Sequence, residues 1–235
     1  MYHTFSVAET IKTAWNILKK NFATIAVYSV IAFLIVLISG FIVYYFFDGE
    51  SILPSFIGFF VLLTEISFIF LAFIKLVFRL IDKEYYDFEF REIIPKIKIL
   101  ISYLTLLVLV STLTVLITHL IENFDKGYTQ NFIGLTIGVI VQFFFLFYFP
   151  ICTCFIVDDA SGPIEAVIQS FHLIKGNFFK YFLIFIIIEA LIFVGSLTIL
   201  GMLFVIPFVN IILVATYRKL VYSHLDVDDD LSETN

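Results

Sequence analysis

Two hydrophobic patterns alternate along the chain. Six long apolar stretches predict membrane-spanning helices, at residues 22–47, 54–78, 99–121, 132–157, 178–197 and 203–222. About 20 apolar residues are needed to cross the roughly 30 Å hydrocarbon core of a bilayer, and each stretch is long enough. Pro150 is expected to kink the end of the fourth span, and Pro207 lies near the start of the sixth. The pattern predicts an all-α, polytopic membrane protein.

Amphipathic segments precede the first and fifth spans. Residues 8–23 read AETIKTAWNILKKNFA and residues 163–179 read PIEAVIQSFHLIKGNFF, both with apolar positions at the helical period. A shift of 156 positions aligns Glu9 with Glu165, Trp15 with Phe171, Lys19 with Lys175, Asn21 with Asn177 and Phe22 with Phe178. The alignment predicts an internal repeat of residues 6–47 and 162–197.

Each amphipathic segment is expected to lie in the headgroup region and to bend at an elbow into the next span. Trp15, Lys19 and Asn21 form the first elbow; the second contains Phe171, Lys175, Gly176 and Asn177. Ser6 and Glu9 have the spacing of a capping box, and Gly176 fits the position just after a helix. Residues 81–98 predict a loop and a short surface helix broken near Pro95, a weak third copy of the amphipathic element.

Composition argues against a water-soluble protein. The 235 residues are 61% hydrophobic and 14% charged, whereas soluble domains are about 45–50% apolar and about 25% charged. The first apolar run is too long for a cleavable signal peptide and is expected to remain as a span. Residues 1–225 are predicted to form a single transmembrane domain, and the acidic residues 226–235 a disordered tail.

The basic residues predict the orientation. Of the 14 Lys and Arg residues, all but Lys126 fall on one side of a six-span chain. Basic residues concentrate on the cytoplasmic side, so both termini are expected there, in a bacterial inner membrane. The two copies then form a parallel repeat about an axis along the membrane normal. No basic patch beyond this asymmetry supports nucleic-acid binding.

The sequence contains no recognisable catalytic or metal-binding motif. Cys152 and Cys154 are one residue apart, so a helix points them to different sides, and neither a disulfide nor a zinc site is expected. His172 is interpreted as a solvated side chain, and His119 as an interfacial hydrogen-bonding group or, alternatively, part of a proton relay. No catalytic residue, cofactor or metal is predicted.

Glu65 and Glu189 form a possible intramembrane polar site. Each lies near the middle of its span, where a charge costs about 2.5–3.5 kcal/mol or more, so both are expected to face the protein interior at similar depth. One interpretation is structural: a neutral carboxyl group that hydrogen-bonds another helix. The other is functional: a site for an ion, a proton or a polar substrate.

A resemblance depends on the second amphipathic copy and the residues before it. The motif consists of Val157-Asp158-Asp159, Gly162-Pro163-Ile164-Glu165-Ala166, Ser170-Phe171-His172-Leu173 and Lys175-Gly176-Asn177-Phe178. It resembles the membrane domain at the N-terminus of some bacterial glycerophosphoryl diester phosphodiesterases, and related stand-alone membrane proteins of unknown function. Catalysis in the fused enzymes belongs to a separate soluble barrel, for which this chain has no room. The resemblance implies a membrane domain without phosphodiesterase activity.

Three functions follow as hypotheses. The first is a structural or accessory role in membrane, lipid or envelope upkeep, with membrane lipids as partners. The alternative is a small transporter or permease that uses Glu65 and Glu189. An intramembrane enzyme is a second alternative, which the lack of a nucleophile–base pair or metal set disfavours. A protein partner and a homo-oligomer are left open.

Overall fold

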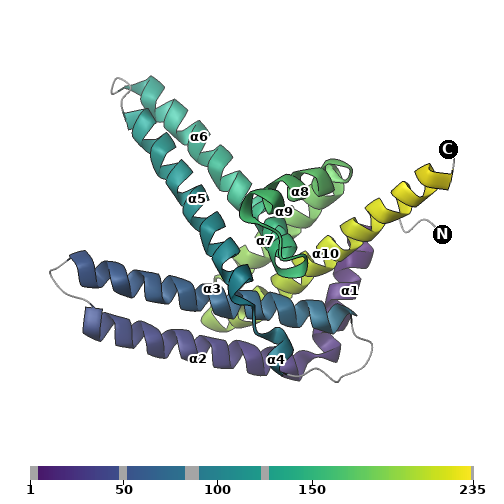
Figure 1. The fold of residues 1–235 in the computed structure, drawn as a ribbon, viewed down its shortest axis with the longest axis horizontal. Coiled ribbons are helices and arrows are strands. Elements are labelled where there is room, and N and C mark those ends of the chain that lie inside the picture. Colours follow the sequence, from purple (N-terminus) through teal and green to yellow (C-terminus); the bar gives the residue numbers. More distant parts are fainter. Residues whose placement is uncertain (1–4, 48–51, 83–89, 123–126, 234–235) are drawn as a thin grey trace.

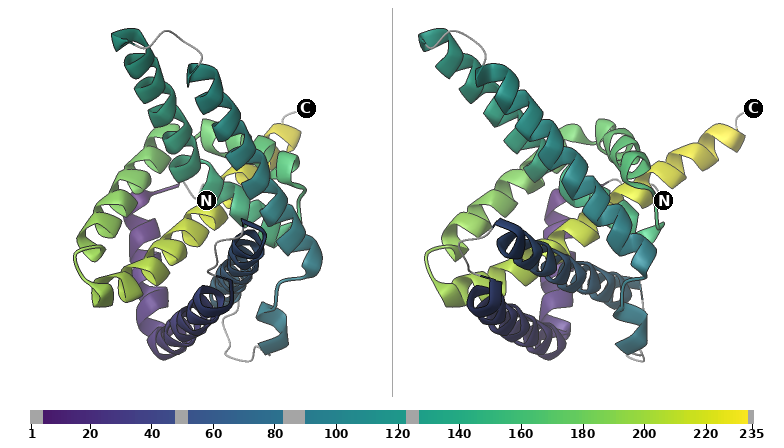
Figure 2. Two further views of the ribbon diagram at one scale, coloured as in Figure 1. Left: turned by 90° about the vertical axis from the view of Figure 1, so that its left-hand side faces the viewer. Right: turned by 60° about the vertical axis from the view of Figure 1, so that its left-hand side comes forward.

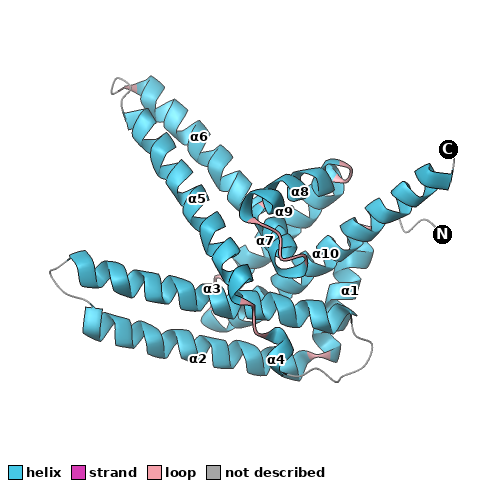
Figure 3. Ribbon diagram, in the orientation of Figure 1, coloured by secondary structure: helices cyan, strands magenta, loops and turns pink. Residues whose placement is uncertain are grey.

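The computed structural model describes residues 5–47, 52–82, 90–122 and 127–233 (Figure 1). Within these ranges the chain has ten helices and no strand (Figure 3). They are α1 (Val7–Lys20), α2 (Phe22–Phe47), α3 (Ile52–Asp82), α4 (Phe90–Ile93), α5 (Ile97–Glu122), α6 (Tyr128–Phe147), α7 (Phe149–Asp158), α8 (Pro163–Lys175), α9 (Phe178–Gly195) and α10 (Ile199–Glu233). The all-α prediction is confirmed.

Six segments are long and apolar enough to cross a membrane, as predicted. They are Phe22–Phe47, Leu53–Asp82, Arg91–Ile121, Phe132–Asp158, Phe178–Gly195 and Gly201–Ser223. The fourth is interrupted at Tyr148, between α6 and α7. The interruption lies beside Pro150, which has no N–H for the helical ladder, so the predicted kink has its expected cause.

The spans form three hairpins that diverge from a common base (Figures 1 and 2). The hairpins are α2–α3, α5–α6 with its continuation α7, and α9–α10. At the base, α3, α7 and α10 pack against one another. The buried core lies there and includes Leu71, Ile74, Val77, Ile151, Ile156, Ile211, Ile212 and Tyr217. A shorter helix precedes each hairpin in the chain: α1, α4 and α8 respectively.

The arms of the hairpins expose large apolar side chains. Phe41 is 67% exposed and Phe59 is 59% exposed. Such surfaces fit the lipid phase of a membrane, where a helix satisfies its backbone groups internally and apolar side chains face acyl chains.

The elbows differ from expectation in their capping. Ser6 is at the N-cap of α1, but its hydroxyl makes no capping hydrogen bond, so the expected capping box does not form. Instead the hydroxyl of Thr10 donates to the Ser6 carbonyl at 2.8 Å. Gly176 directly follows α8, as expected, and takes a right-handed conformation with φ −73°. Asn21 ends α1, and its side-chain amide donates to the Ile17 carbonyl at 3.0 Å.

Helix α4 and the end of α10 can also be compared with the sequence predictions. Helix α4 ends before Pro95, and residues 94–96 are not helical, which confirms the predicted break. Helix α10 continues to Glu233, through most of the segment expected to be a disordered tail. No proline or glycine follows Pro207 to end the helix. Lys126 and residues 83–89 lie outside the described residues.

Candidate functional site

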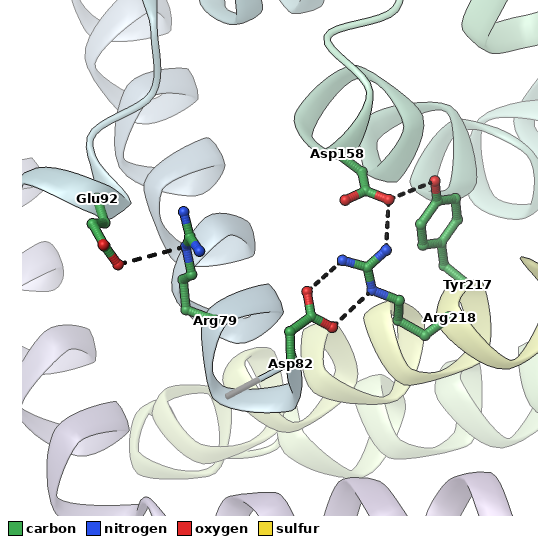
Figure 4. A network of polar contacts seen from close by, with 6 residues as sticks. All are labelled: Arg79, Asp82, Glu92, Asp158, Tyr217 and Arg218. Carbon is green, nitrogen blue, oxygen red and sulfur yellow. Dashed lines mark hydrogen bonds and ion pairs between the residues drawn. The ribbon is translucent and has the colours of Figure 1, made fainter. Parts of the chain in front are cut away.

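One arginine of α10 connects the C-terminal ends of α3 and α7 at the base (Figure 4). Arg218 of α10 donates from Nε to Asp82 Oδ1 at 3.0 Å and from Nη1 to Asp158 Oδ2 at 2.7 Å. Its Nη2 contacts the other oxygen of Asp82. The planar guanidinium allows this, because it presents donors to a carboxylate as a fork and still has donors for a second one.

Aromatic side chains complete the surroundings of the arginine. The Tyr217 hydroxyl donates to Asp158 Oδ2 at 3.1 Å, and the Arg218 guanidinium lies 4.6 Å from the centre of the Phe78 ring. The Arg218 side chain is 17% exposed, compared with 35% for Asp82 and 21% for Asp158. The cluster is thus partly shielded from solvent, and its charges stabilise each other more than charges in open water do.

A cavity of about 340 Å³ adjoins this cluster. Four cationic and two anionic side chains line it: Lys75, Arg79, Lys96 and Arg218, and Asp82 and Asp158. Lys75 donates to the Ile94 carbonyl at 2.8 Å, and Arg79 lies 3.7 Å from Glu92. The two carboxylates lining the cavity are bound by Arg218, which leaves an excess of positive charge among the other lining residues.

Asp159 follows α7 and lies next to the cluster in the chain. Burial raises the pKa of its carboxyl group, and the negative charge of Asp158 raises it further. The Arg218 cation opposes the shift, and Glu165 adds to it. The charged form of Asp159 is therefore less favourable here than in water.

Glu65 lines a groove along α3. The groove has a volume of about 690 Å³, and its lining consists of Phe56, Ile57, Phe60, Val61, Thr64, Glu65, Phe68 and Leu100. The Glu65 side chain is half-buried and makes no hydrogen bond or ion pair to another described residue. Its surroundings are otherwise apolar apart from the Thr64 hydroxyl, which donates to the Phe60 carbonyl at 2.8 Å.

The structure does not bring Glu189 to Glu65. Glu189 is half-buried in α9, whose principal neighbours are α10, α1 and α8, with further ring contacts to α6. Helix α3 packs against α2, α4, α5, α7 and α10, so α10 is the principal neighbour that the two helices share. Among described residues, Glu189 also has no hydrogen-bond or ion-pair partner. A shared proton or ion between the two carboxyl groups therefore has no support in the packing of these helices.

Both elbows contain aromatic contacts. Trp15 packs edge-on against Phe208 with ring centres 5.6 Å apart, and the Lys19 ammonium lies 5.2 Å from the Trp15 ring centre. In the second elbow, the rings of Phe171 and Tyr148 are 4.1 Å apart. A cavity of about 340 Å³ there is lined by Tyr148, Phe171, His172, Lys175 and Phe178. Asn177 separates α8 from α9, with Gly176 beside it.

The two cysteines lie in the packed interior of the protein. Both thiols are free and buried, and Cys152 Sγ lies 3.2 Å from the Ser170 hydroxyl. No group of three or more metal-ligating side chains occurs within the described ranges.

The arginine cluster was missed by reasoning from sequence. Asp82, Asp158 and Arg218 each stand at or near the C-terminal end of a predicted span, where charged residues normally mark the end of the apolar run. The sequence did carry one signal. Two acidic residues and one basic residue stand at the same end of three spans that are predicted to cross the membrane in the same direction.

The described residues that line the cavity carry more cations than anions, an arrangement that can hold an anion. No protein-family model, no curated protein and no solved structure matches the chain.

Proposed function

We propose that the chain is an accessory protein of a bacterial inner membrane that binds membrane lipids without changing them chemically. The observation that supports this most is the groove along α3, whose lining is apolar apart from Thr64 and Glu65. Phe56 and Val61 remain 58% and 48% exposed within it. Acyl chains suit such a surface because they make dispersion contacts and need no polar partners.

The internal repeat is part of this proposal. Every buried residue of α1 has a buried counterpart 156 positions later in α8: Thr10 and Ala166, Ala14 and Ser170, and Leu18 and Ile174. The two helices thus use corresponding faces for contact with the bundle. We infer that residues 6–47 and 162–197 are copies, and that the charged faces of α1 and α8 lie at the membrane surface.

The orientation is proposed from the same elements. Lys219 Nζ near the end of the last span lies 3.7 Å from Glu9 Oε2 in α1, so these two parts of the chain share one side of the bundle. The basic residues favour the cytoplasm for that side. The resemblance to the membrane domain of bacterial glycerophosphoryl diester phosphodiesterases belongs to the same proposal, without their catalytic function.

A transporter is the second candidate, because Glu65 lies in the groove without a partner among the described residues. The alternative requires a proton or an ion to reach Glu65. It predicts that Glu65→Gln abolishes flux while the protein stays folded.

Native mass spectrometry of the purified chain, with flux measurements in proteoliposomes, tests both candidates. Val61→Trp should narrow the groove and reduce the number of retained lipids. Leu34→Trp on α2, at a side chain 48% exposed, is the matched control and should leave lipid retention unchanged. Proton flux above that of empty liposomes, lost in Glu65→Gln, would instead favour the transporter.

A further inference from the structure

We propose that the cavity at the base binds a phosphate ester group, with Lys75, Arg79 and Lys96 as its cationic ligands. Arg218 also lines the cavity, but Asp82 and Asp158 accept its hydrogen bonds. Among the described residues that line the cavity, no carboxylate forms an ion pair with Lys75, Arg79 or Lys96. An anion of one or two negative charges would offset much of their positive charge.

The three cations are held near one another by the fold. Lys75 and Arg79 are one turn apart on α3, and Lys96 precedes α5 across the cavity. Arg79 and Lys96 are close enough to Lys75 to act on its ammonium group electrostatically. Glu92, at 3.7 Å from Arg79, offsets only part of this charge. Clustering like charges is unfavourable, and a bound anion would remove that repulsion.

The cavity and the apolar groove lie along one face of α3. Val61, Glu65, Phe68, Ala72, Lys75, Arg79 and Asp82 follow one another at spacings of three and four residues, which places them on one side of the helix. On α5, Leu100 lines the groove and its neighbour Ile99 lines the cavity. One molecule could therefore contact both.

The distance between Glu65 and Lys75 along α3 matches the length of one lipid leaflet's hydrocarbon layer. Ten residues separate Glu65 from Lys75, which is about 15 Å at 1.5 Å per residue. The distance is about half of a roughly 30 Å hydrocarbon core, so Lys75 would reach headgroup depth if Glu65 is at the midplane. The inference depends on the proposed lipid-binding function only for the source of the phosphate, which is either a lipid headgroup or a soluble phosphate ester.

Ligand-dependent thermal stability of the purified full chain in a nonionic detergent tests the inference. The probes are phosphatidylglycerol, glycerol 1-phosphate and diacylglycerol, which present phosphate with acyl chains, phosphate alone and acyl chains alone. Phosphatidylglycerol should raise the melting temperature most. Arg79→Gln/Lys96→Gln should require at least about tenfold more phosphatidylglycerol for the same rise, because charge-assisted hydrogen bonds are lost.

Lys12→Gln/Lys180→Gln is the matched control, because it removes two exposed cations away from the cavity and should respond as the unmodified chain does. If the double variant at the cavity does not fold, Lys96→Glu replaces it, since that side chain is exposed. An equal response of all variants to phosphatidylglycerol would overturn the phosphate site while leaving lipid binding intact. A response to glycerol 1-phosphate that the cavity variant loses would keep the site and assign it to a soluble ester. No response to any probe would overturn both proposals.

Discussion

The base of the bundle and the arms of its hairpins are both built from apolar spans but are held in place differently. In the most apolar window of α2, 6% of the residues are buried, compared with 56% in α10. The base is therefore specified by contacts within the protein. The arms depend on their internal helical hydrogen bonds and on the surrounding lipid. Substitutions at the base should change stability far more than substitutions on the arms.

The largest effect is expected at Arg218. Arg218→Leu would leave Asp82 and Asp158 without their cation in a partly shielded site, at a cost of about 2–4 kcal/mol in the free energy of unfolding. Unfolding by a denaturing detergent in mixed micelles measures this. Lys219→Leu is the neighbouring control: its partner Glu9 is 70% exposed at 3.7 Å, so less than about 1 kcal/mol is expected. Equal losses in the two variants would show that the arginine does not hold the base together.

A second substitution tests whether any part of an arm is packed as tightly as the base. A Cβ on Gly58 would lie 2.7 Å from Val43 Cγ1 and 2.9 Å from Phe47 Cβ, so Gly58→Ala should force α2 and α3 apart. We expect a loss of about 1–3 kcal/mol, typical of overpacking. Gly40→Ala, where nothing lies within 4 Å of the added carbon, should instead be neutral or stabilising by up to about 1 kcal/mol. The same unfolding assay compares them, and a tolerated Gly58→Ala would mean that the hairpin contact is not tight.

Sequence reasoning found the spans because length and apolarity are properties of a segment by itself. The predicted limits of the first span coincide with those of α2. The Arg218 cluster could not be found this way, since its partners lie 136 and 60 residues away in the chain. Which helix ends meet is decided by packing of the whole bundle, and an apolar run carries no information about its neighbours.

The helix faces that carry Glu65 and Glu189 could not be assigned from sequence. Counting residues placed Glu65 and Glu189 near mid-span, but the side of the helix that faces a partner depends on which spans are adjacent. The structure places them on α3 and α9, which share α10 as a neighbour but otherwise have different principal packing partners. The capping box predicted at Ser6 was wrong: the Ser6 hydroxyl makes no cap, and the Thr10 hydroxyl donates to the Ser6 carbonyl.

A smaller difference between base and arm is expected for tyrosine hydroxyls. Tyr181 is buried, and its hydroxyl donates to the Phe147 carbonyl at 2.7 Å, so Tyr181→Phe should lower the free energy of unfolding by about 1 kcal/mol. Tyr45 on the α2 arm is 81% exposed, and Tyr45→Phe should have no measurable effect. Unfolding in mixed micelles again gives both values. A loss at Tyr45 as large as that at Tyr181 would contradict the distinction between base and arm.

The smallest expected effect is a pH dependence at Asp159. Burial, with Asp158 and Glu165, raises the pKa of this carboxyl group in the folded protein above its ordinary value of 3.8. The folded chain therefore binds the proton more tightly than the unfolded chain. The stability from this proton is fully present below the unfolded pKa and is lost as pH rises through the folded pKa.

Asp159→Asn removes the titration, so unmodified protein should lose stability relative to this variant as pH rises from 4 toward 7. The Arg218 cation opposes the pKa shift, so the same comparison made in an Arg218→Leu background should give a steeper pH dependence. Thermal unfolding across this pH range measures both slopes. A flat difference in the unmodified background would show that Asp159 is solvated as in water. A slope unchanged by Arg218→Leu would show that the cluster at the base does not extend electrostatically to the turn after α7.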